Sequence, residues 1–229
     1  MHLGNARGLG LKVMRYDSLI FDLDGTISDP SVGISRSINY ALLHHGFEVC
    51  SREQISSLIG LPLDQMYYRL ATDVDERQIP SMVDKYRERY LEIGFSENVM
   101  YDGMRDVIDE LYQLGSCNLG ICTSKRNDIA EKILQMFELT ECFRFVSGGE
   151  IGISKSQQIA VLLESSAISD RSMMIGDRSV DILAAHSNGL QSTGVLWGYG
   201  SRCELKEVCA GHLSDAPAEL LEYLNTQAI

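Results

Sequence analysis

Residues 19–29, with the sequence LIFDLDGTISD, place a short apolar run directly before two carboxylates and a Gly-Thr turn. Side chains two positions apart in a strand lie on the same face, so Asp22 and Asp24 would be neighbours if the strand continued regularly. Two carboxylates this close repel each other unless a cation neutralises them or one of them holds a proton. The pattern therefore indicates either a reaction site or a strand that ends in an ordinary Asp-Gly turn.

Apolar runs alternate with helical patterns along the C-terminal part of the chain. We expect strands over residues 18–23, 117–122, 145–147 and 172–175, and helices over residues 106–114, 129–137, 157–163 and 182–187. This alternation predicts an α/β fold: a doubly wound, mainly parallel, Rossmann-like sheet with helices on both faces. The carboxyl ends of parallel strands share one edge of the sheet, so Asp22, Thr123 and Asp177 are expected to meet there.

The segment between the first strand and this alternating region reads as almost wholly helical. Apolar residues recur at helical spacing within it, and its fourth helix is expected over residues 77–93. The sequence therefore predicts a core domain of residues 16–29 and 97–229, interrupted by an α-helical domain of residues 30–96. We expect residues 1–15, which precede the first strand, to form a flexible N-terminal extension.

Composition limits the classes of protein to which this chain can belong. The 229 residues are 45% hydrophobic, which is enough for a full core. The formal net charge of -12 opposes extended contact with a nucleic-acid backbone, so no nucleic-acid polymer is expected as a partner. No apolar run suits a signal peptide or a membrane span, so we expect a cytoplasmic location and no membrane partner. The six cysteines include no C-x-x-C pair, and we expect them to be reduced and mainly packing residues.

Three further segments contain residue types that phosphate or metal chemistry requires. They are residues 120–125 (GICTSK) with Thr123, residues 154–156 (SKS) with Lys155, and residues 173–181 (MMIGDRSVD) with Asp177 and Asp181. Each has a plainer interpretation when it stands alone. Thr123 would be a helix N-cap, Lys155 a solvated lysine, and Asp181 a polar residue on an exposed helix face. Their order along the chain favours the functional interpretation, because chance agreement of all the segments is far rarer than that of one.

Together with residues 21–26 (FDLDGT), these segments resemble the four motifs of the haloacid dehalogenase-like hydrolase superfamily. The helical insertion is similar to the cap of the branch that contains phosphoglycolate phosphatases and 5'-nucleotidases. The resemblance implies a phosphatase that acts on a small phosphorylated metabolite, with Mg2+ as its cofactor. Dehalogenase members lack the second aspartate, so Asp24 favours phosphate ester chemistry. Phosphoglycolate-like and nucleoside monophosphate substrates both stay open.

The resemblance also implies a role for each site residue. Asp22 is the nucleophile that forms an aspartyl phosphate, and Asp24 protonates the leaving alkoxide and then activates the hydrolytic water. Thr123 orients the phosphoryl oxygens, and Lys155 holds the charge of the nucleophile and of the phosphate. The implied metal ligands are hard oxygens that suit magnesium. They come from Asp22, the main-chain carbonyl of Asp24, Asp177 and Asp181.

The helical cap is expected to close over the site and to exclude water from the phosphoryl intermediate. Asp29-Pro30 and residues 95–101 are its expected hinges. Residues 60–63 (GLPL) resemble a cap loop that faces the active site, but they equally suit a plain turn with Pro62 as the first residue of a helix. Arg36 is a further candidate for contact with an anion.

Two alternatives to a phosphatase stay open. A hexose-phosphate mutase of the same superfamily keeps both aspartates, and it differs in cap contacts that the sequence does not reveal. A non-catalytic aspartate switch or binding module also combines acidic residues, a Thr or Ser and a Lys on a doubly wound sheet. Receiver modules of this kind are about half as long and have no helical insertion after their first strand, which favours an enzyme here.

Overall fold

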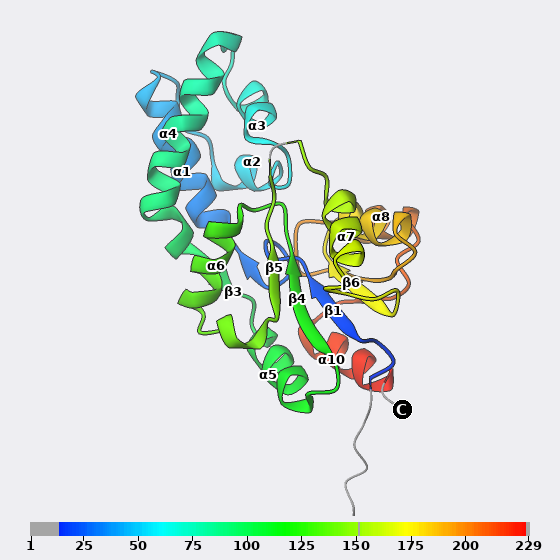
Figure 1. Cartoon of the computed structure of the whole chain (residues 1–229). Coiled ribbons are helices and arrows are strands. Elements are labelled where there is room, and N and C mark those ends of the chain that lie inside the picture. Colours follow the sequence, from blue (N-terminus) through cyan, green and yellow to red (C-terminus); the bar gives the residue numbers. More distant parts are fainter. Residues whose placement is uncertain (1–13, 151, 228–229) are drawn as a thin grey trace, which may run out of the picture.

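The computed structural model describes residues 14–150 and 152–227. Its centre is a six-stranded sheet in the order β5-β4-β1-β6-β7-β8, in which every neighbouring pair is parallel (Figure 1). The strands are β1 (Ser18–Phe21), β4 (Asn118–Cys122), β5 (Phe145–Ser147), β6 (Ser172–Gly176), β7 (Gln191–Val195) and β8 (Leu213–Ser214). The predicted α/β fold is confirmed, and the strands expected from the sequence are all present. Strands β7 and β8 are additional, since the sequence predicts no strand beyond residue 175.

Helices cover both faces of the sheet. They are α5 (Met104–Leu114), α6 (Asn127–Met136), α7 (Lys155–Glu164), α8 (Ser179–Ser187), α9 (Arg202–Glu207) and α10 (Pro217–Thr226). The strand period of two separates the two faces. Leu19 and Phe21 pack into one core cluster with residues of α5, α6 and α10, whereas Ile20 packs into another with residues of α7 and α8. The sheet is therefore doubly wound, as the alternation of strands and helices predicts.

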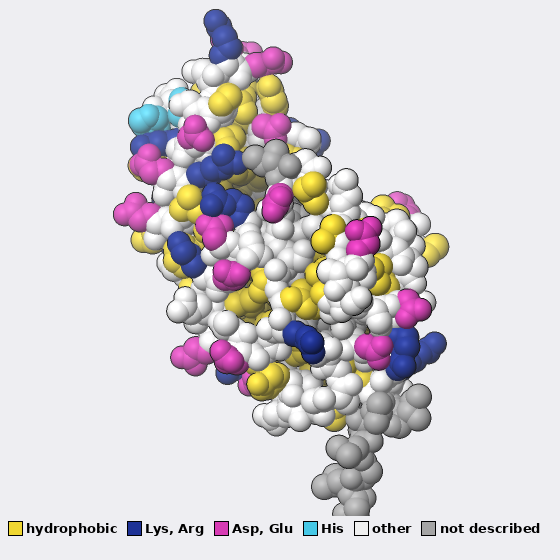
Figure 2. Space-filling model, viewed as in Figure 1, with side chains coloured by type: hydrophobic (Ala, Val, Ile, Leu, Met, Phe, Trp, Pro, Cys, Tyr) yellow, Lys and Arg dark blue, Asp and Glu magenta, His cyan; other side chains and the backbone are white. Residues whose placement is uncertain are grey.

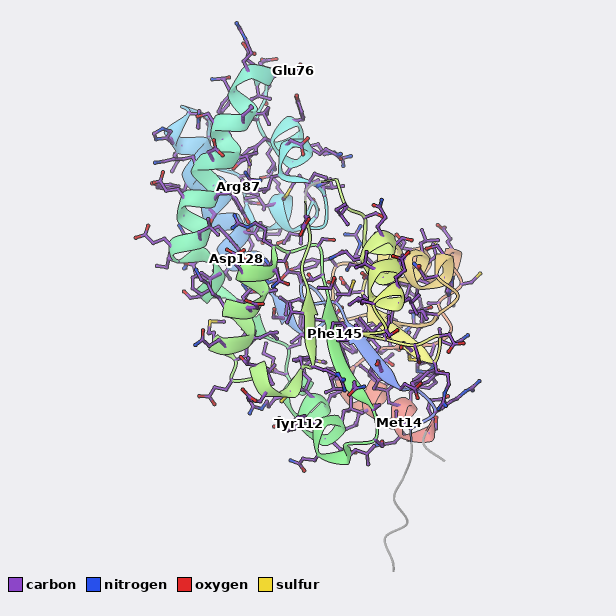
Figure 3. All side chains as sticks on the ribbon, viewed as in Figure 1. Met14, Glu76, Arg87, Tyr112, Asp128 and Phe145 are labelled. Atoms are coloured by element: carbon purple, nitrogen blue, oxygen red, sulfur yellow. The ribbon has the colours of Figure 1, made fainter. Side chains whose placement is uncertain are left out.

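The helical insertion forms a group of helices at one end of the molecule (Figure 1). Its helices are α1 (Ser31–His44), α2 (Arg52–Ser56), α3 (Leu63–Leu70) and α4 (Ile79–Glu92), with a 3-10 turn, η1 (Glu76–Gln78), before α4. In Figure 3, Glu76 lies at the far tip of this group, while Tyr112 on α5 lies toward the opposite end of the molecule. Helices α1 and α4 pack together, and Ile38 and Met82 are fully buried between them. The limits of residues 30–96 for a separate cap domain stay a prediction.

Two short strands that the sequence does not predict connect the helical group to the core. β2 (Ser28–Asp29) and β3 (Val99–Met100) pair antiparallel, with Ser28 opposite Met100. A 3-10 turn, η2 (Gly94–Glu97), precedes β3. The two segments expected as hinges, Asp29-Pro30 and residues 95–101, therefore contain the two strands of one hydrogen-bonded ribbon. Strands of two residues are too short to show an alternation of polar and apolar side chains, which is why the sequence did not indicate them.

Strand β1 ends at Phe21, two residues before its predicted end. The backbone N–H of Asp22 donates to the carbonyl of Ile175 at 2.9 Å, and the chain then turns at Gly25, whose φ is 89°. The strand therefore does not continue regularly to Asp24, which was the condition for Asp22 and Asp24 to be neighbours on one face. Since the strand stops, Asp22 and Asp24 need not share a face, and their carboxylates take different partners.

Acidic and basic side chains are interspersed on the surface, as Figure 2 shows for one face. No helix of the described part of the chain is long and apolar enough to cross a membrane. All six cysteines lie among the described residues and are unpaired, and burial raises the pKa of Cys122 to about 12, consistent with a packing residue. Of the extension expected over residues 1–15, residues 1–13 lie outside the described residues. Met14 is buried, and Arg15 N–H donates to the Gln227 carbonyl at 2.9 Å.

Candidate active site

All predicted site residues lie at the carboxyl edge of the sheet. Four of them follow the ends of strands: Asp22 and Asp24 after β1, Thr123 after β4, and Asp177 after β6. The other two lie in the first turn of a helix, Lys155 in α7 and Asp181 in α8. Strands β4, β1 and β6 are neighbours in the sheet, so their ends lie side by side. The strand order therefore brings together residues that lie as far apart in the sequence as Asp22 and Asp181.

Three carboxylates form the centre of the site. Asp22, Asp177 and Asp181 each place one oxygen so that the three oxygens lie within 4.8 Å of one another, and we call this group the acidic cluster. Asp177 and Asp181 are fully buried and Asp22 is nearly so. Buried carboxylates at this separation repel unless a cation lies among them, and hard oxygen ligands of this kind suit Mg2+.

Burial, and after it charge repulsion, raises the pKa values of two carboxyl groups of the cluster, Asp177 and Asp181. Burial, followed by the charges of Asp22 and Asp181, raises the pKa of Asp177 to about 7. Burial also raises the pKa of Asp181 to about 6, although the Lys155 ammonium opposes this rise. A divalent cation among the three carboxylates would stabilise their charged forms and bring these pKa values down. The donor set therefore fits a metal ion of the kind that the sequence predicts.

Lys155 contacts two members of the acidic cluster. Its Nζ lies 2.9 Å from Asp22 Oδ1 and donates a hydrogen bond to Asp181 Oδ1. Burial by itself lowers the pKa of the ammonium, but the Asp181 and Asp22 charges raise it above its ordinary value. The side chain is almost fully buried, so the interpretation of a solvated lysine is wrong.

Local capping places Lys155 at the start of α7. The Ser154 side chain accepts a hydrogen bond from Gln157 N–H, and the Gln157 side chain accepts one from Ser154 N–H. This reciprocal pair is a capping box, which begins the helix at the residue after the serine. The sequence S-x-x-Q therefore determines where the lysine leaves the backbone.

The backbone around the acidic cluster holds two of its carboxylates in place. Tyr199 N–H donates to Asp177 Oδ2 at 2.7 Å, and Arg178 N–H donates to Asp181 Oδ2 at 3.0 Å. A Cβ atom at Gly25 would collide with the Asp177 carboxylate, so this turn requires glycine for space as well as for its positive φ. Asp181 is inaccessible, so its interpretation as a residue on an exposed helix face is wrong.

Thr123 is buried directly after β4. Its Oγ1 accepts a hydrogen bond from Lys125 N–H at 3.2 Å, and its backbone N–H donates to the Ser147 carbonyl at 3.0 Å. Helix α6 begins only at Asn127, after Arg126 as a cap residue without a side-chain hydrogen bond. The alternative of Thr123 as a plain helix N-cap is therefore wrong.

Asp24 lies outside the acidic cluster and is paired with Lys125, a residue that the sequence patterns did not single out. Lys125 Nζ lies 2.9 Å from Asp24 Oδ2 and donates to the Tyr90 hydroxyl at 2.7 Å. Burial raises the pKa of Asp24, while Lys125 opposes this rise. The only signal in the sequence was the position of Lys125 within residues 120–125, where a lysine after Thr-Ser reads as a surface residue.

The two cap features named from the sequence, Arg36 and residues 60–63, differ in their relation to the site. Arg36 Nη1 contacts Glu97 Oε1 at 2.6 Å and is mostly exposed, so the structure pairs it with a carboxylate rather than with the site. Pro62 precedes α3 as its cap residue, so its expected place as the first helical residue is one position off. Within residues 60–63, Gly60 has a φ of 104° and lies against the guanidinium of Arg178. Arg178 Nη1 donates to the Ile59 carbonyl at 2.8 Å, which ties this loop to the residue after Asp177.

The chain is similar to known proteins over most of its length. The family model described as haloacid dehalogenase-like hydrolase matches residues 19–195, which include every predicted site residue. A crystal structure of a predicted phosphatase from Clostridium acetobutylicum superimposes with a TM-score of 0.81 and 32% sequence identity, covering 91% of this chain and 98% of that one.

Curated relatives carry several activities in their names. A 5'-nucleotidase from Pseudomonas aeruginosa is 34% identical over 197 residues, covering 84% of this chain and 88% of that protein. The tyrosine-protein kinase PtkA from Mycobacterium tuberculosis is 30% identical over 186 residues, covering 80% of this chain and 62% of that protein. A phosphoglycolate phosphatase from Agrobacterium fabrum is 28% identical over 188 residues, covering 79% of this chain and 80% of that protein.

Proposed function

Because the chain belongs to the haloacid dehalogenase-like hydrolases, we propose that it is a Mg2+-dependent phosphatase that hydrolyses a small phosphomonoester through an aspartyl phosphate. The observation that carries this proposal is the buried acidic cluster with Lys155 Nζ 2.9 Å from Asp22 Oδ1. A carboxylate is a weak nucleophile, and it attacks phosphorus only where positive charge draws electron density from the phosphoryl group.

The residues that would hold Mg2+ are Asp22, Asp177 and Asp181. The resemblance to the family adds the main-chain carbonyl of Asp24. When bound, the ion would supply charge that offsets the phosphate dianion and the carboxylates. Lys155 adds a fixed positive charge beside the nucleophile and cannot easily lose its proton there, because two carboxylates raise its pKa. We infer that Asp22 attacks the phosphorus and expels the alkoxide.

Asp24 is the acid and base of this proposal. One carboxyl oxygen is paired with Lys125, while Oδ1 is buried and has no hydrogen-bond partner among the residues that the structure describes. This free oxygen suits proton transfer to the leaving alkoxide and, later, proton removal from the water that hydrolyses the aspartyl phosphate. Thr123, whose hydroxyl accepts from Lys125 N–H, keeps its own proton to donate to a phosphoryl oxygen.

The helices α1 to α4 would act as a cap that excludes water from the phosphoenzyme. The names of the relatives support a nucleoside monophosphate or a phosphoglycolate-like substrate. The net charge of -12 opposes a polynucleotide, and we infer a cytoplasmic location from the unpaired cysteines. A hexose-phosphate mutase and a non-catalytic module are the alternatives that the experiment must separate from hydrolysis.

The test is phosphate release with Mg2+ from phosphoglycolate, nucleoside monophosphates, hexose phosphates and p-nitrophenyl phosphate, with the Asp22→Asn variant beside the wild type. We expect metal-dependent release that the variant abolishes, while its melting temperature shows that it still folds. Conversion of a hexose phosphate to its isomer without phosphate release would favour the mutase. A wild-type protein that releases no phosphate and converts no sugar phosphate would reject the enzyme.

A further inference from the structure

We propose that Tyr90 of helix α4 and Lys125 of the core form a positioning pair that holds the Asp24 carboxyl for proton transfer. The inference rests on the proposed function, because it takes Asp24 as the acid and base. Neither residue belongs to the acidic cluster, and neither was singled out by the sequence patterns. Both act through Asp24 rather than on the substrate.

The contacts of Lys125 carry the inference. Its Nζ lies 2.9 Å from Asp24 Oδ2, donates to the Tyr90 hydroxyl at 2.7 Å, and lies 4.7 Å from the centre of the Tyr90 ring. The lysine side chain is only 9% exposed, so few water molecules can replace these partners. A buried ammonium requires its hydrogen bonds, and the loss of one partner leaves the charge poorly satisfied and free to move.

The pairing also selects which Asp24 oxygen remains free. Because Lys125 occupies Oδ2, the carboxyl rotation is restrained, and the buried Oδ1 is left without a partner in the described part of the chain. Proton transfer requires an acid held within hydrogen-bond reach of the reacting oxygen in a defined orientation. Without the lysine, the carboxyl could rotate and present either oxygen.

Tyr90 belongs to the helical group and restrains Lys125 from that side. It lies on α4, its ring stacks on that of Tyr86 with centroids 5.2 Å apart, and its hydroxyl also accepts from Asn98 Nδ2 at 3.4 Å. Lys125 follows β4 of the core. The hydrogen bond between Lys125 and Tyr90 therefore joins the two parts of the molecule next to Asp24. The acid is fully positioned only when α4 rests on the core.

The experiment compares kcat/KM of Tyr90→Phe on two kinds of leaving group. Alkyl phosphates such as phosphoglycolate and AMP expel a poor leaving group that needs an acid, whereas p-nitrophenyl phosphate expels a stable phenolate. Because kcat/KM reports the steps up to leaving-group departure, the later hydrolysis of the phosphoenzyme does not affect its value. We expect a loss of about 10- to 100-fold on the better alkyl phosphate and less than about 2-fold on p-nitrophenyl phosphate.

The matched control is Tyr40→Phe. It deletes an exposed hydroxyl of α1 that donates to Glu88 of α4, the helix that carries Tyr90, at 2.7 Å. This control variant should leave kcat/KM unchanged on both kinds of substrate. Lys125→Met should reproduce the selective loss, and adding Tyr90→Phe to it should cost nothing more, because the tyrosine acts through the lysine. Equal losses on both substrates, no loss, or additive losses in the double variant would overturn the positioning pair. A wild type inactive on every substrate would instead remove the proposed function.

Discussion

Gly25 is the residue where an added side chain most directly tests the geometry of the proposed metal site. Its φ is 89°, and a Cβ atom there would collide with the Asp177 carboxylate. We expect Gly25→Ala to displace Asp177 and weaken Mg2+ activation by about 10- to 100-fold, measured as the Mg2+ concentration that gives half-maximal phosphatase activity.

Gly46→Ala is the control for the backbone strain of that substitution. Gly46 has a similar φ of 81°, but no atom of the described residues lies within 4 Å of the place that a Cβ atom would take there. Both variants should lose about 1 kcal/mol of stability because alanine is strained at positive φ. An unchanged Mg2+ requirement in Gly25→Ala, or the same change in both variants, would contradict the role of Gly25 in placing Asp177.

Lys155 allows a test of charge compensation at the scale of one residue. Lys155→Met removes the cation between Asp22 and Asp181 and leaves two buried carboxylates that repel. We expect the free energy of unfolding without metal to fall by about 3 kcal/mol at pH 8, with Mg2+ restoring part of the loss. Urea unfolding measures this change, and the exposed Lys206→Met serves as the control. Equal stability of Lys155→Met and wild type in the absence of metal would show that the lysine does not neutralise the cluster.

At the scale of elements, Asn98 holds the chain where it returns from the helical group to the core. Its buried side chain accepts from Ser28 Oγ at 3.2 Å and donates to the Phe95 carbonyl at 3.0 Å, which links β2 to the turn before β3. Asn98→Ala leaves the buried Ser28 hydroxyl without its acceptor and removes one of two donors from the Phe95 carbonyl, which still accepts from the backbone N–H of residue 98 at 3.4 Å. We therefore expect the free energy of unfolding, measured by chemical denaturation, to fall by about 1–3 kcal/mol.

Asn225→Ala is a suitable comparison for this element, because Asn225 bonds Glu110 at 2.9 Å near the surface. The free energy of unfolding of Asn225→Ala should stay within about 0.5 kcal/mol of the wild-type value. If the two alanine variants were equally stable, the Asn98 side-chain hydrogen bonds would contribute nothing beyond those of a surface pair, and the backbone pairing of β2 with β3 would hold the ribbon without them.

For the whole molecule, we expect the acidic cluster to make stability depend on pH and on Mg2+. The folded-state pKa values of Asp177, about 7, and Asp181, about 6, lie above the ordinary aspartate value of 3.8, so the folded protein binds more protons than the unfolded chain between these values. Stability from these groups is present at low pH and is lost as pH rises through 6 and 7. Without metal, we expect the melting temperature to fall between pH 5 and pH 8.

Mg2+ should reverse this trend, because in the proposed site it would bind the deprotonated carboxylates and stabilise the folded state by mass action. The rise in melting temperature caused by about 10 mM Mg2+ should be larger at pH 8 than at pH 5. Asp177→Asn should reduce both the pH dependence and the Mg2+ effect. A metal-free protein whose melting temperature rises steadily from pH 5 to pH 8 would show that other groups dominate.

The sequence by itself determined the parts of this protein that depend on neighbouring residues. Alternating apolar runs and helical patterns predicted the parallel sheet. The Ser154 capping box starts the helix at Lys155, and the short motifs placed Asp22 and Asp177 at strand ends. These features arise from the side-chain periods of strands and helices and from local turn chemistry, which act over a few residues. They are therefore encoded locally, although the helix predicted over residues 157–163 began two residues after its observed start at Lys155.

Tertiary structure alone decided which partners those residues meet. Lys125 reaches Tyr90 across 35 positions of the chain, and Tyr199 reaches Asp177 across 22, through contacts that exist only after the helices pack on the sheet. The two-residue ribbon likewise depends on pairing between β2 and β3, which lie far apart in the sequence, rather than on local preference. Pairings of this kind leave no periodic signal in the sequence, because they are set by packing between elements.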